Sequence, residues 1–156
     1  MDETDRLILS MLQENGRISN AEIGRRVALA ASSVFQRVRR LEEQGVIERY
    51  RCVLNPAALE VGLVAFVSIR TNDARPERGA GAALAGMPHV LEVHRVAGDA
   101  CFIVKLRVRD TEALDRILED IADIPSIRST STTIVVRTMK ETLDLPLPES
   151  PVPGVP

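Results

Sequence analysis

Residues 19–47 read SNAEIGRRVALAASSVFQRVRRLEEQGVI, and this stretch decides the fold of the N-terminal part of the chain. Ser19 and Glu22 have the spacing of a capping box, which predicts the start of a helix. A second helix is predicted over residues 31–43, because apolar residues recur there at helical spacing. Its apolar stripe is formed by Val34, Val38 and Leu41. The stretch therefore predicts two short helices joined by a tight turn at residues 28–30.

The outer face of the second helix is polar and basic. The side chains that point outward or flank the apolar stripe are Ser32, Ser33, Gln36, Arg37, Arg39 and Arg40. Short polar side chains allow close approach to base edges, Gln can pair with adenine, and Arg can pair with guanine or phosphate. The pattern predicts a helix-turn-helix that reads DNA with these residues, and the alternative is a solvated basic face on a small helical bundle.

Charge is distributed unevenly along the chain. The 156 residues carry a net charge of −2, which alone argues against binding to a polyanion. Residues 17–51, however, hold eight arginines against four glutamates, whereas residues 61–156 hold 11 basic and 13 acidic residues. A basic module on a neutral-to-acidic carrier indicates a localised electrostatic footprint for nucleic acid.

The predicted N-terminal domain spans residues 1–54. Apolar residues at helical spacing predict a further helix over residues 5–14, and the acidic residues at its start suit the helix dipole. Residues 46–53 alternate weakly between apolar and polar, as a strand or wing would. Three short helices followed by such a segment predict a winged helix-turn-helix.

The periodicity changes after residues 55–61, which we expect to be a linker because Asn55-Pro56 breaks the chain. Residues 62–144 then follow a βαββαβ pattern. We expect strands over residues 63–71, 90–96, 101–108 and 127–139, and helices over residues 76–85 and 111–122. Thr111 is the expected N-cap of the last helix. Two helices on one face of a four-stranded antiparallel sheet make a ferredoxin-like α+β domain, whose open face a second copy of the chain can cover.

Composition sets further limits. Hydrophobic residues make up 45% of the chain and aromatic ones only 3%, which predicts an aliphatic core. The apolar runs are too short to span a bilayer and the N-terminus is acidic, so we expect a cytoplasmic protein. Cys52 and Cys101 are expected to be reduced and buried. Neither the cysteines nor His89 and His94 have metal-ligand spacing, so we expect no metal and no cofactor. Residues 145–156 are a Pro-rich tail, expected to be extended.

The chain resembles the Lrp/AsnC, or feast/famine, family of transcription regulators. The matching motifs are Asp5-x-x-Ile8-Leu9, Ala21-Glu22-Ile23 and Val34-x-x-Arg37-Val38-x-x-Leu41-Glu42-x-x-Gly45-Val46-Ile47. The likeness covers residues 2–145 and implies a sequence-specific regulator that binds double-stranded DNA and has a RAM/ACT-like C-terminal domain. It also implies homodimers that pair through their sheets and often assemble into tetramers or octamers. Small effectors, commonly amino acids, are implied to bind where the C-terminal domains of neighbouring dimers meet.

The chain departs from the family pattern at two places. The turn usually reads Gly-Leu-Ser, but residues 28–30 are Ala-Leu-Ala, so Ala30 cannot cap the helix and about 1 kcal/mol of stabilisation is lost. The resemblance implies an effector pocket formed by Gly98, Asp99, Ala100, Cys101, Thr130 and Thr132. The family loop reads approximately Gly-Asp-x-Asp, and Cys101 replaces its second acid, which weakens the case for an ordinary amino-acid effector. The simpler alternatives are that Asp99 is a turn residue and that the threonines are β-formers.

Two other functions stay open at this point, although we expect the chain not to be an enzyme. Siroheme decarboxylases resemble this family in both domains, but only His94 and Arg95 offer suitable side chains for such a site. The remaining alternative is a low-specificity architectural protein that wraps DNA around its oligomer.

Overall fold

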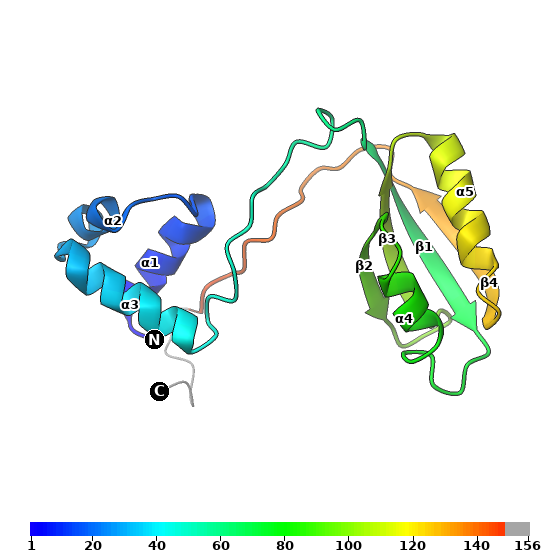
Figure 1. Cartoon of the computed structure of the whole chain (residues 1–156), viewed down its shortest axis with the longest axis horizontal. Helices are drawn as coiled ribbons and strands as arrows, with labels where there is room; N and C mark the ends of the chain where they lie inside the picture. The colour runs from blue at the N-terminus through cyan, green and yellow to red at the C-terminus, as the bar shows by residue number, and fades with distance from the viewer. Residues whose placement is uncertain (149–156) are drawn as a thin grey trace. The chain divides into compact units, whose positions relative to one another are not determined.

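The computed structural model describes residues 1–148, which form two compact units. One unit contains Met1–Val53 together with residues 141–148, and the other contains Leu54–Lys140 (Figure 1). The first part of the predicted tail belongs to the N-terminal unit. Leu145 exchanges two backbone hydrogen bonds with the Gln13 side chain there, at 2.7 and 3.1 Å. The rest of that tail, residues 149–156, lies outside the described residues.

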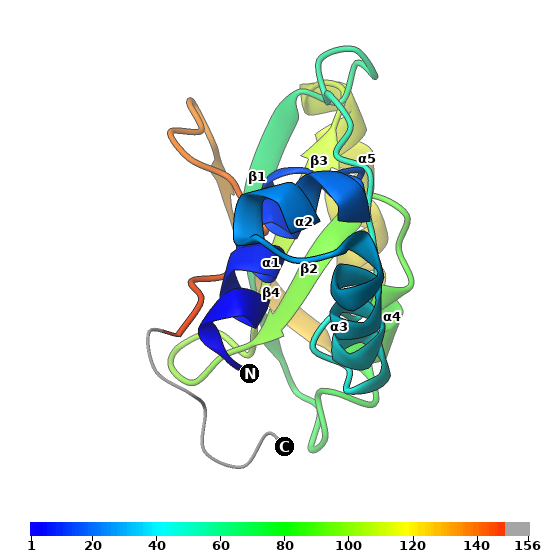
Figure 2. The same ribbon diagram turned by 90° about the vertical axis from the view of Figure 1, so that its left-hand side faces the viewer.

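The first unit contains the three predicted helices, which Figure 2 shows as α1 (Glu3–Glu14), α2 (Asn20–Val27) and α3 (Ala31–Glu43). Helix α1 begins two residues earlier than expected, because Asp2 and Asp5 form a capping box around its first turn. The core between the helices is built from Ile8, Ile23, Val34 and Val38. The side chains of the predicted apolar stripe of α3 are therefore buried as expected.

Helix α2 has only half of the predicted capping box. The Ser19 hydroxyl accepts a hydrogen bond from the Glu22 amide at 3.1 Å, as expected. The Glu22 carboxylate, however, pairs with Arg25 and Arg26 on its own helix instead of reaching back to Ser19. The prediction of a reciprocal box is therefore wrong, because two nearby guanidinium groups compete successfully for the carboxylate.

The turn between α2 and α3 is tight, and two of its residues, Ala28 and Ala30, are not those that favour such a turn. Ala28 adopts a left-handed conformation with φ of 56°, which costs an L-residue about 1 kcal/mol. Gly24 makes room for the turn, because a Cβ there would collide with the Leu29 carbonyl oxygen. Ala30 is the N-cap residue of α3, and its methyl side chain cannot accept a hydrogen bond. The prediction that α3 lacks a side-chain cap is therefore confirmed.

Residues 46–53, all of which the structure describes, form no strand, so of the strand or wing predicted there the strand is not present. The segment is extended and is held to α3 by side chains. The Tyr50 hydroxyl donates to Glu42 at 2.8 Å, and Ile47 packs against the helical core. Burial and, secondarily, this hydrogen bond raise the pKa of Tyr50 to about 12, so its hydroxyl keeps its proton near neutral pH.

The second unit has the predicted βαββαβ order. Its elements are β1 (Leu63–Thr71), α4 (Ala80–Ala85), β2 (Val90–Arg95), β3 (Phe102–Val108), α5 (Thr111–Ala122) and β4 (Ile127–Ile134). The four antiparallel strands lie in the order β2-β3-β1-β4, with α4 and α5 on one face (Figure 1). The ferredoxin-like α+β prediction is confirmed.

Several element ends in this unit differ from expectation, each for a local reason. Helix α4 begins at Ala80 rather than at residue 76. The Asp73 carboxylate accepts a hydrogen bond from the Ala80 amide at 3.0 Å and so supports the first turn at Ala80. Strand β4 stops at Ile134 rather than at residue 139, close to the end of its pairing with β1: the Val135 amide donates to the Val64 carbonyl at 2.9 Å, and β1 begins one residue before Val64, at Leu63. Thr111 is not the cap of α5; Asp110 is, since its carboxylate accepts from the Ala113 amide at 2.8 Å.

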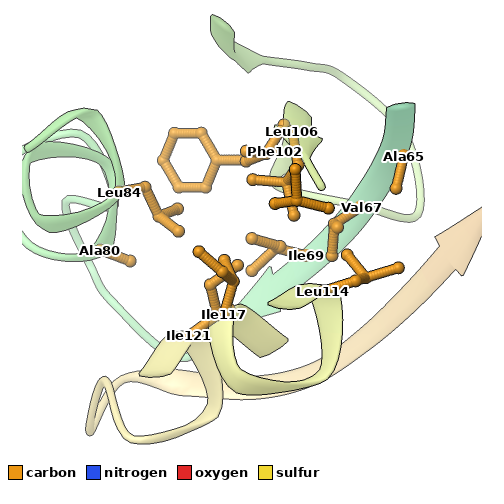
Figure 3. Close-up of a cluster of buried hydrophobic side chains, with 12 residues drawn as sticks. Ala65, Val67, Ile69, Ala80, Leu84, Phe102, Leu106, Leu114, Ile117 and Ile121 are labelled. Atoms are coloured by element: carbon orange, nitrogen blue, oxygen red, sulfur yellow. The ribbon is translucent and has the colours of Figure 1, made fainter. Parts of the chain in front are cut away.

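The core of this unit fills the space between the sheet and its two helices (Figure 3). The buried side chains from the sheet and helices include Ala65, Val67, Ile69, Leu84, Phe102, Val104, Leu106, Leu114, Ile117 and Ile121. Phe102 is the one aromatic ring in this otherwise aliphatic cluster, in keeping with the composition. The alternate residues of β1, Phe66, Ser68 and Arg70, lie on the opposite face, which the helices of this unit do not cover.

The uncapped start of α3 gives a direct test of local stability. Replacing Ala30 by Ser supplies a hydroxyl that can accept from the first-turn amides, so the free energy of unfolding should rise by about 1 kcal/mol. Urea unfolding followed by circular dichroism measures this gain. The matched control is Ala31→Ser, one position inside the helix, which should be neutral or slightly destabilising. Equal effects of the two substitutions would contradict the assignment of Ala30 as the N-cap.

Candidate nucleic-acid interface and effector site

Helix α3 presents two chemically different faces. Val34, Val38 and Leu41 are buried against the rest of the unit, whereas Ser32, Gln36 and Arg39 are exposed on the other side. Ser33 is half-buried beside the turn. The predicted separation of an apolar inner face from a polar outer face is therefore present, and the outer face is available to a large ligand.

A buried carboxylate holds α3 against α1. Asp5 is 0% exposed, and it accepts hydrogen bonds from Arg37 Nη1 at 2.8 Å and from Arg40 Nη2 at 2.7 Å. Arg37 Nη1 also donates to the Asp2 carboxylate at 2.7 Å. The backbone amide of Asp2 donates a third hydrogen bond to the Asp5 carboxylate at 3.0 Å. We call this group, formed by Asp2, Asp5, Arg37 and Arg40, the Asp5 clamp.

The charges of the clamp support one another. The hydrogen bond from Arg37 holds the pKa of Asp2 below its usual range, and the hydrogen bonds to Asp2 and Asp5 raise the pKa of Arg37. Asp2 and Arg37 therefore stay ionised around neutral pH. A buried carboxylate is costly unless it is paired and hydrogen-bonded, so the two guanidinium groups are needed to keep Asp5 in the core.

The clamp divides the six predicted DNA-binding residues into two groups. The Arg37 side chain is only 28% exposed and is engaged by two carboxylates, so its position suits a role in fixing α3. Arg40 is also tied to Asp5 but remains half-exposed. Arg39 is more exposed and makes a surface pair with Glu43 at 2.8 Å, which is weak and easily exchanged for another anion.

Sequence reasoning missed the acidic half of the clamp. The acidic residues at the start of α1 were interpreted through the helix dipole alone, although Asp5 lies within the Asp5-x-x-Ile8-Leu9 motif. The sequence does contain a signal for it. Asp5 lies three residues before the core residue Ile8, so both side chains are on the buried face of the helix. A carboxylate at a core register needs a cationic partner, and the basic helix was the obvious source of one.

A second candidate site is a hollow of about 330 Å³ on the sheet of the second unit. It is lined by Ser68, Arg70, Asp99, Ala100, Ser129, Thr130 and Ser131. The register of β1 with β4 sets Ser68 opposite Ser131 and Arg70 opposite Ser129. The loop between β2 and β3 brings Asp99 to the same place, with its Oδ2 3.9 Å from Arg70 Nη2.

This hollow contains some of the residues predicted for the effector pocket but not others. Asp99, Ala100 and Thr130 line it, whereas Gly98, Cys101 and Thr132 are outside its lining. Gly98 takes the positive φ of 139° that the loop requires. Cys101 packs against the hydrophobic core, and Thr132 pairs with the buried Val67.

The chemistry of the hollow is that of a zwitterion site. Arg70 supplies a cation, Asp99 an anion and the surrounding Ser and Thr residues supply hydroxyls, which can hydrogen-bond to either charged end of a small ligand. Ser68 and Arg70 were not predicted, because their contribution depends on strand register rather than on a local motif.

Other predicted features can also be located. Cys52 is exposed and Cys101 is only half-buried, so the expectation of two buried thiols is wrong. Within residues 1–148, no group of three or more potential metal-binding side chains comes together, and no helix is long and apolar enough to cross a membrane.

A helix-turn-helix with an exposed polar helix, joined to an α+β unit with a charged hollow, defines the class of two-domain DNA-binding regulators. Residues 1–48 match the family model described as winged helix-turn-helix DNA-binding, and residues 64–145 match the one described as Lrp/AsnC ligand binding domain. The chain belongs to the Lrp/AsnC family of transcriptional regulators, so the resemblance predicted from the motifs is confirmed.

Relatives cover nearly the whole chain. The HTH-type transcriptional regulator FL11 of Pyrococcus horikoshii is 35% identical over 147 residues, covering 94% of this chain and 97% of the relative. The leucine-responsive regulatory protein of Escherichia coli is 38% identical over 144 residues, covering 90% and 88%. Among solved structures, a Neisseria meningitidis transcriptional regulator in complex with L-Met has a TM-score of 0.88 at 30% identity, covering 94% and 96%. Escherichia coli AsnC has a TM-score of 0.85 at 27% identity, covering 90% and 95%.

The Asp5 clamp predicts a large stability effect from a small substitution. Asp5→Asn keeps the shape of the side chain but removes the charge that two arginines share, so the free energy of unfolding should fall by about 2–3 kcal/mol. This is less than for a fully buried pair, because the arginines are partly exposed. Urea unfolding measures the loss.

The matched control for the clamp is Glu43→Gln, which removes the partner of Arg39 from a surface pair. Its effect should stay within about 0.5 kcal/mol. A clamp variant no less stable than this control would show that Asp5 does not hold α3 in place.

Proposed function

We propose that the chain recognises specific DNA sequences through the outer face of α3, with Gln36 and Arg39 as its principal base-reading and phosphate-binding side chains. The observation that carries this proposal is the division of α3 by the Asp5 clamp. Arg37 and Arg40 anchor the helix, and this leaves Ser32, Gln36 and Arg39 exposed on a helix of fixed orientation. Gln can pair with adenine, and Arg with guanine or phosphate. Ser33 and Arg40 lie beside this face and can add contacts to the DNA backbone.

We further propose that the chain works as a homodimer, assembled into tetramers or octamers, in the cytoplasm. The open face of the sheet supports this proposal, since Phe66 is exposed there and helices cover only the opposite face. A symmetric dimer presents two copies of α3 and so favours near-palindromic sites. Sedimentation velocity measures the assembly directly, and a monomer at micromolar concentration would contradict it.

The hollow that contains Arg70 and Asp99 is the proposed effector site. An amino acid offers an ammonium group to Asp99 and a carboxylate to Arg70, and the L-Met complex of the Neisseria relative supports this class of ligand. Asp99 carries the acidic role alone in this hollow, because it is the one acidic residue of the lining and position 101 has a Cys in place of the family's second Asp. Thr130 supplies one of the hydroxyls.

The two alternative functions have simple tests. A siroheme-decarboxylase-like enzyme would change the Soret absorbance of added siroheme or haem, and we expect no change, since the relatives reported above are named as regulators. An architectural protein would bind random duplexes as tightly as its preferred site, whereas a regulator would not.

The base-reading role of α3 predicts a selective defect. In the Gln36→Ala/Arg39→Ala double variant, the preference for a site selected from randomised duplexes over random DNA should fall by about ten- to hundred-fold. Loss of Arg39 should also reduce the salt dependence of binding. Anisotropy titrations with both duplexes at several salt concentrations measure these quantities.

Arg109→Ala is the matched control, because Arg109 is an equally exposed arginine that pairs with Asp110 in the second unit. It should bind like the wild type. If the double variant kept the wild-type preference, the outer face of α3 would not be the reader.

The effector proposal predicts thermal stabilisation. An amino acid that binds only the folded protein must raise its melting temperature, and a screen of the standard amino acids should find at least one that does so by several degrees. Asp99→Asn should abolish the shift. Thr132→Val should preserve it, because Thr132 is outside the lining of the hollow. A shift that survives Asp99→Asn would place the effector elsewhere.

A further inference from the structure

Phe35 is an exposed aromatic residue on a helix that otherwise separates apolar from polar side chains. Its side chain is 54% exposed, whereas Phe102 is 2% exposed in the core of the second unit. Phe35 is also outside the cluster of apolar residues that packs the helical unit. Of the four aromatic side chains in the chain, Phe35 is the most exposed, and it is the one that lies on the helix proposed to read DNA.

The position of Phe35 places it at the leading end of α3. Ser32 is three residues before it and Arg39 four residues after it, so all three lie along one side of the helix. Side chains on a helix lean towards its N-terminus, so the Phe35 ring covers the first turn. That turn is rich in methyl groups, because Ala30 and Ala31 are both exposed there.

The leading end of α3 therefore offers an apolar surface beside polar base-reading groups. In a helix-turn-helix the N-terminal part of the recognition helix meets the base edges in the major groove. The thymine C5-methyl is the one apolar group among the base edges exposed in that groove. An aromatic ring with neighbouring methyl groups is chemically matched to it and to no hydrogen-bonding base edge.

We propose that Phe35 is a specificity-determining residue that contacts the C5-methyl group of a thymine in each half-site. This inference rests on the proposed function, in which the outer face of α3 reads DNA. It adds apolar readout to the hydrogen bonds of Gln36 and Arg39. Because the ring is exposed, removing it leaves the helical core intact.

The test is a cycle that combines a protein change with a base change. A binding site is first selected from randomised duplexes with the wild-type chain, and each thymine in it is then replaced by deoxyuridine, which lacks only the methyl group. At one thymine per half-site, the wild type should lose about three- to five-fold in affinity, the order expected for one methyl group removed from an apolar contact. Phe35→Ala should bind the thymine and deoxyuridine duplexes equally well, whereas Phe35→Leu should keep part of the difference.

Leu7→Ala is the matched control, since Leu7 is a similarly exposed apolar residue on α1. It should retain the full wild-type sensitivity to the methyl group. Urea unfolding and sedimentation velocity on each variant establish that fold and assembly are unchanged.

The outcomes separate this inference from the proposed function. If the wild type selects a site but Phe35→Ala keeps the same sensitivity to every thymine methyl, the role of Phe35 is overturned while the reading role of α3 stands. If Phe35→Ala changes the sedimentation coefficient, the ring belongs to an interface between copies, and the inference is again overturned. If the wild type selects no site at all, the proposed function fails and the thymine contact fails with it.

Discussion

The buried Asp5 carboxylate is the constraint on which the DNA-facing half of the molecule depends. It has no access to solvent, so its charge is tolerable only because Arg37 and Arg40 reach it from α3. The same two contacts fix the orientation of α3 relative to α1. The arginines that make the helix basic in sequence are therefore of two kinds: Arg37 and Arg40 define where the helix lies, and Arg39 is exposed on its outside. A count of positive charges cannot distinguish the anchoring arginines from the exposed one. The position of the Asp5 carboxylate does distinguish them.

The sequence predicted what depends on local periodicity and failed where a distant partner decides. The change from helical spacing to alternation gave β1 and α5 with the observed bounds, because each has a full amphipathic pattern. The end of β4 depends instead on where β1 begins, some seventy residues earlier in the chain. The start of α4 depends on a hydrogen bond from the Ala80 amide to Asp73, which lies outside the helix. In both cases the boundary depends on a residue outside the element itself.

The same limit applies to the candidate effector site. Asp99 could be predicted because it belongs to a short loop motif, and the structure brings it to a hollow. Arg70 and Ser68 could not, since they look like ordinary residues of a half-exposed strand until the register sets them opposite Ser129 and Ser131. Cys101 is the reverse case. Its place in the motif suggested a pocket residue, but it is the last residue before β3 and packs against the core.

Local rules are broken most densely at the leading end of α3. Ala28 adopts a left-handed conformation that Gly would take without strain, Ala30 stands where a capping oxygen is expected, and Phe35 exposes an aromatic ring. The other long helices, α1, α2 and α5, have side-chain caps at Asp2, Ser19 and Asp110, and the departures outside α3 are scattered, such as the positive φ of Glu60 and the uncapped start of α4. Departures from local consistency are expected to gather where function, rather than stability, selects the residue. Ala28 and Ala30 also stand where the family usually has Gly and Ser, so the turn has lost a flexible residue and a polar one. The end of α3 that meets DNA in a helix-turn-helix is thus the part of this chain where the local rules of folding are broken most densely.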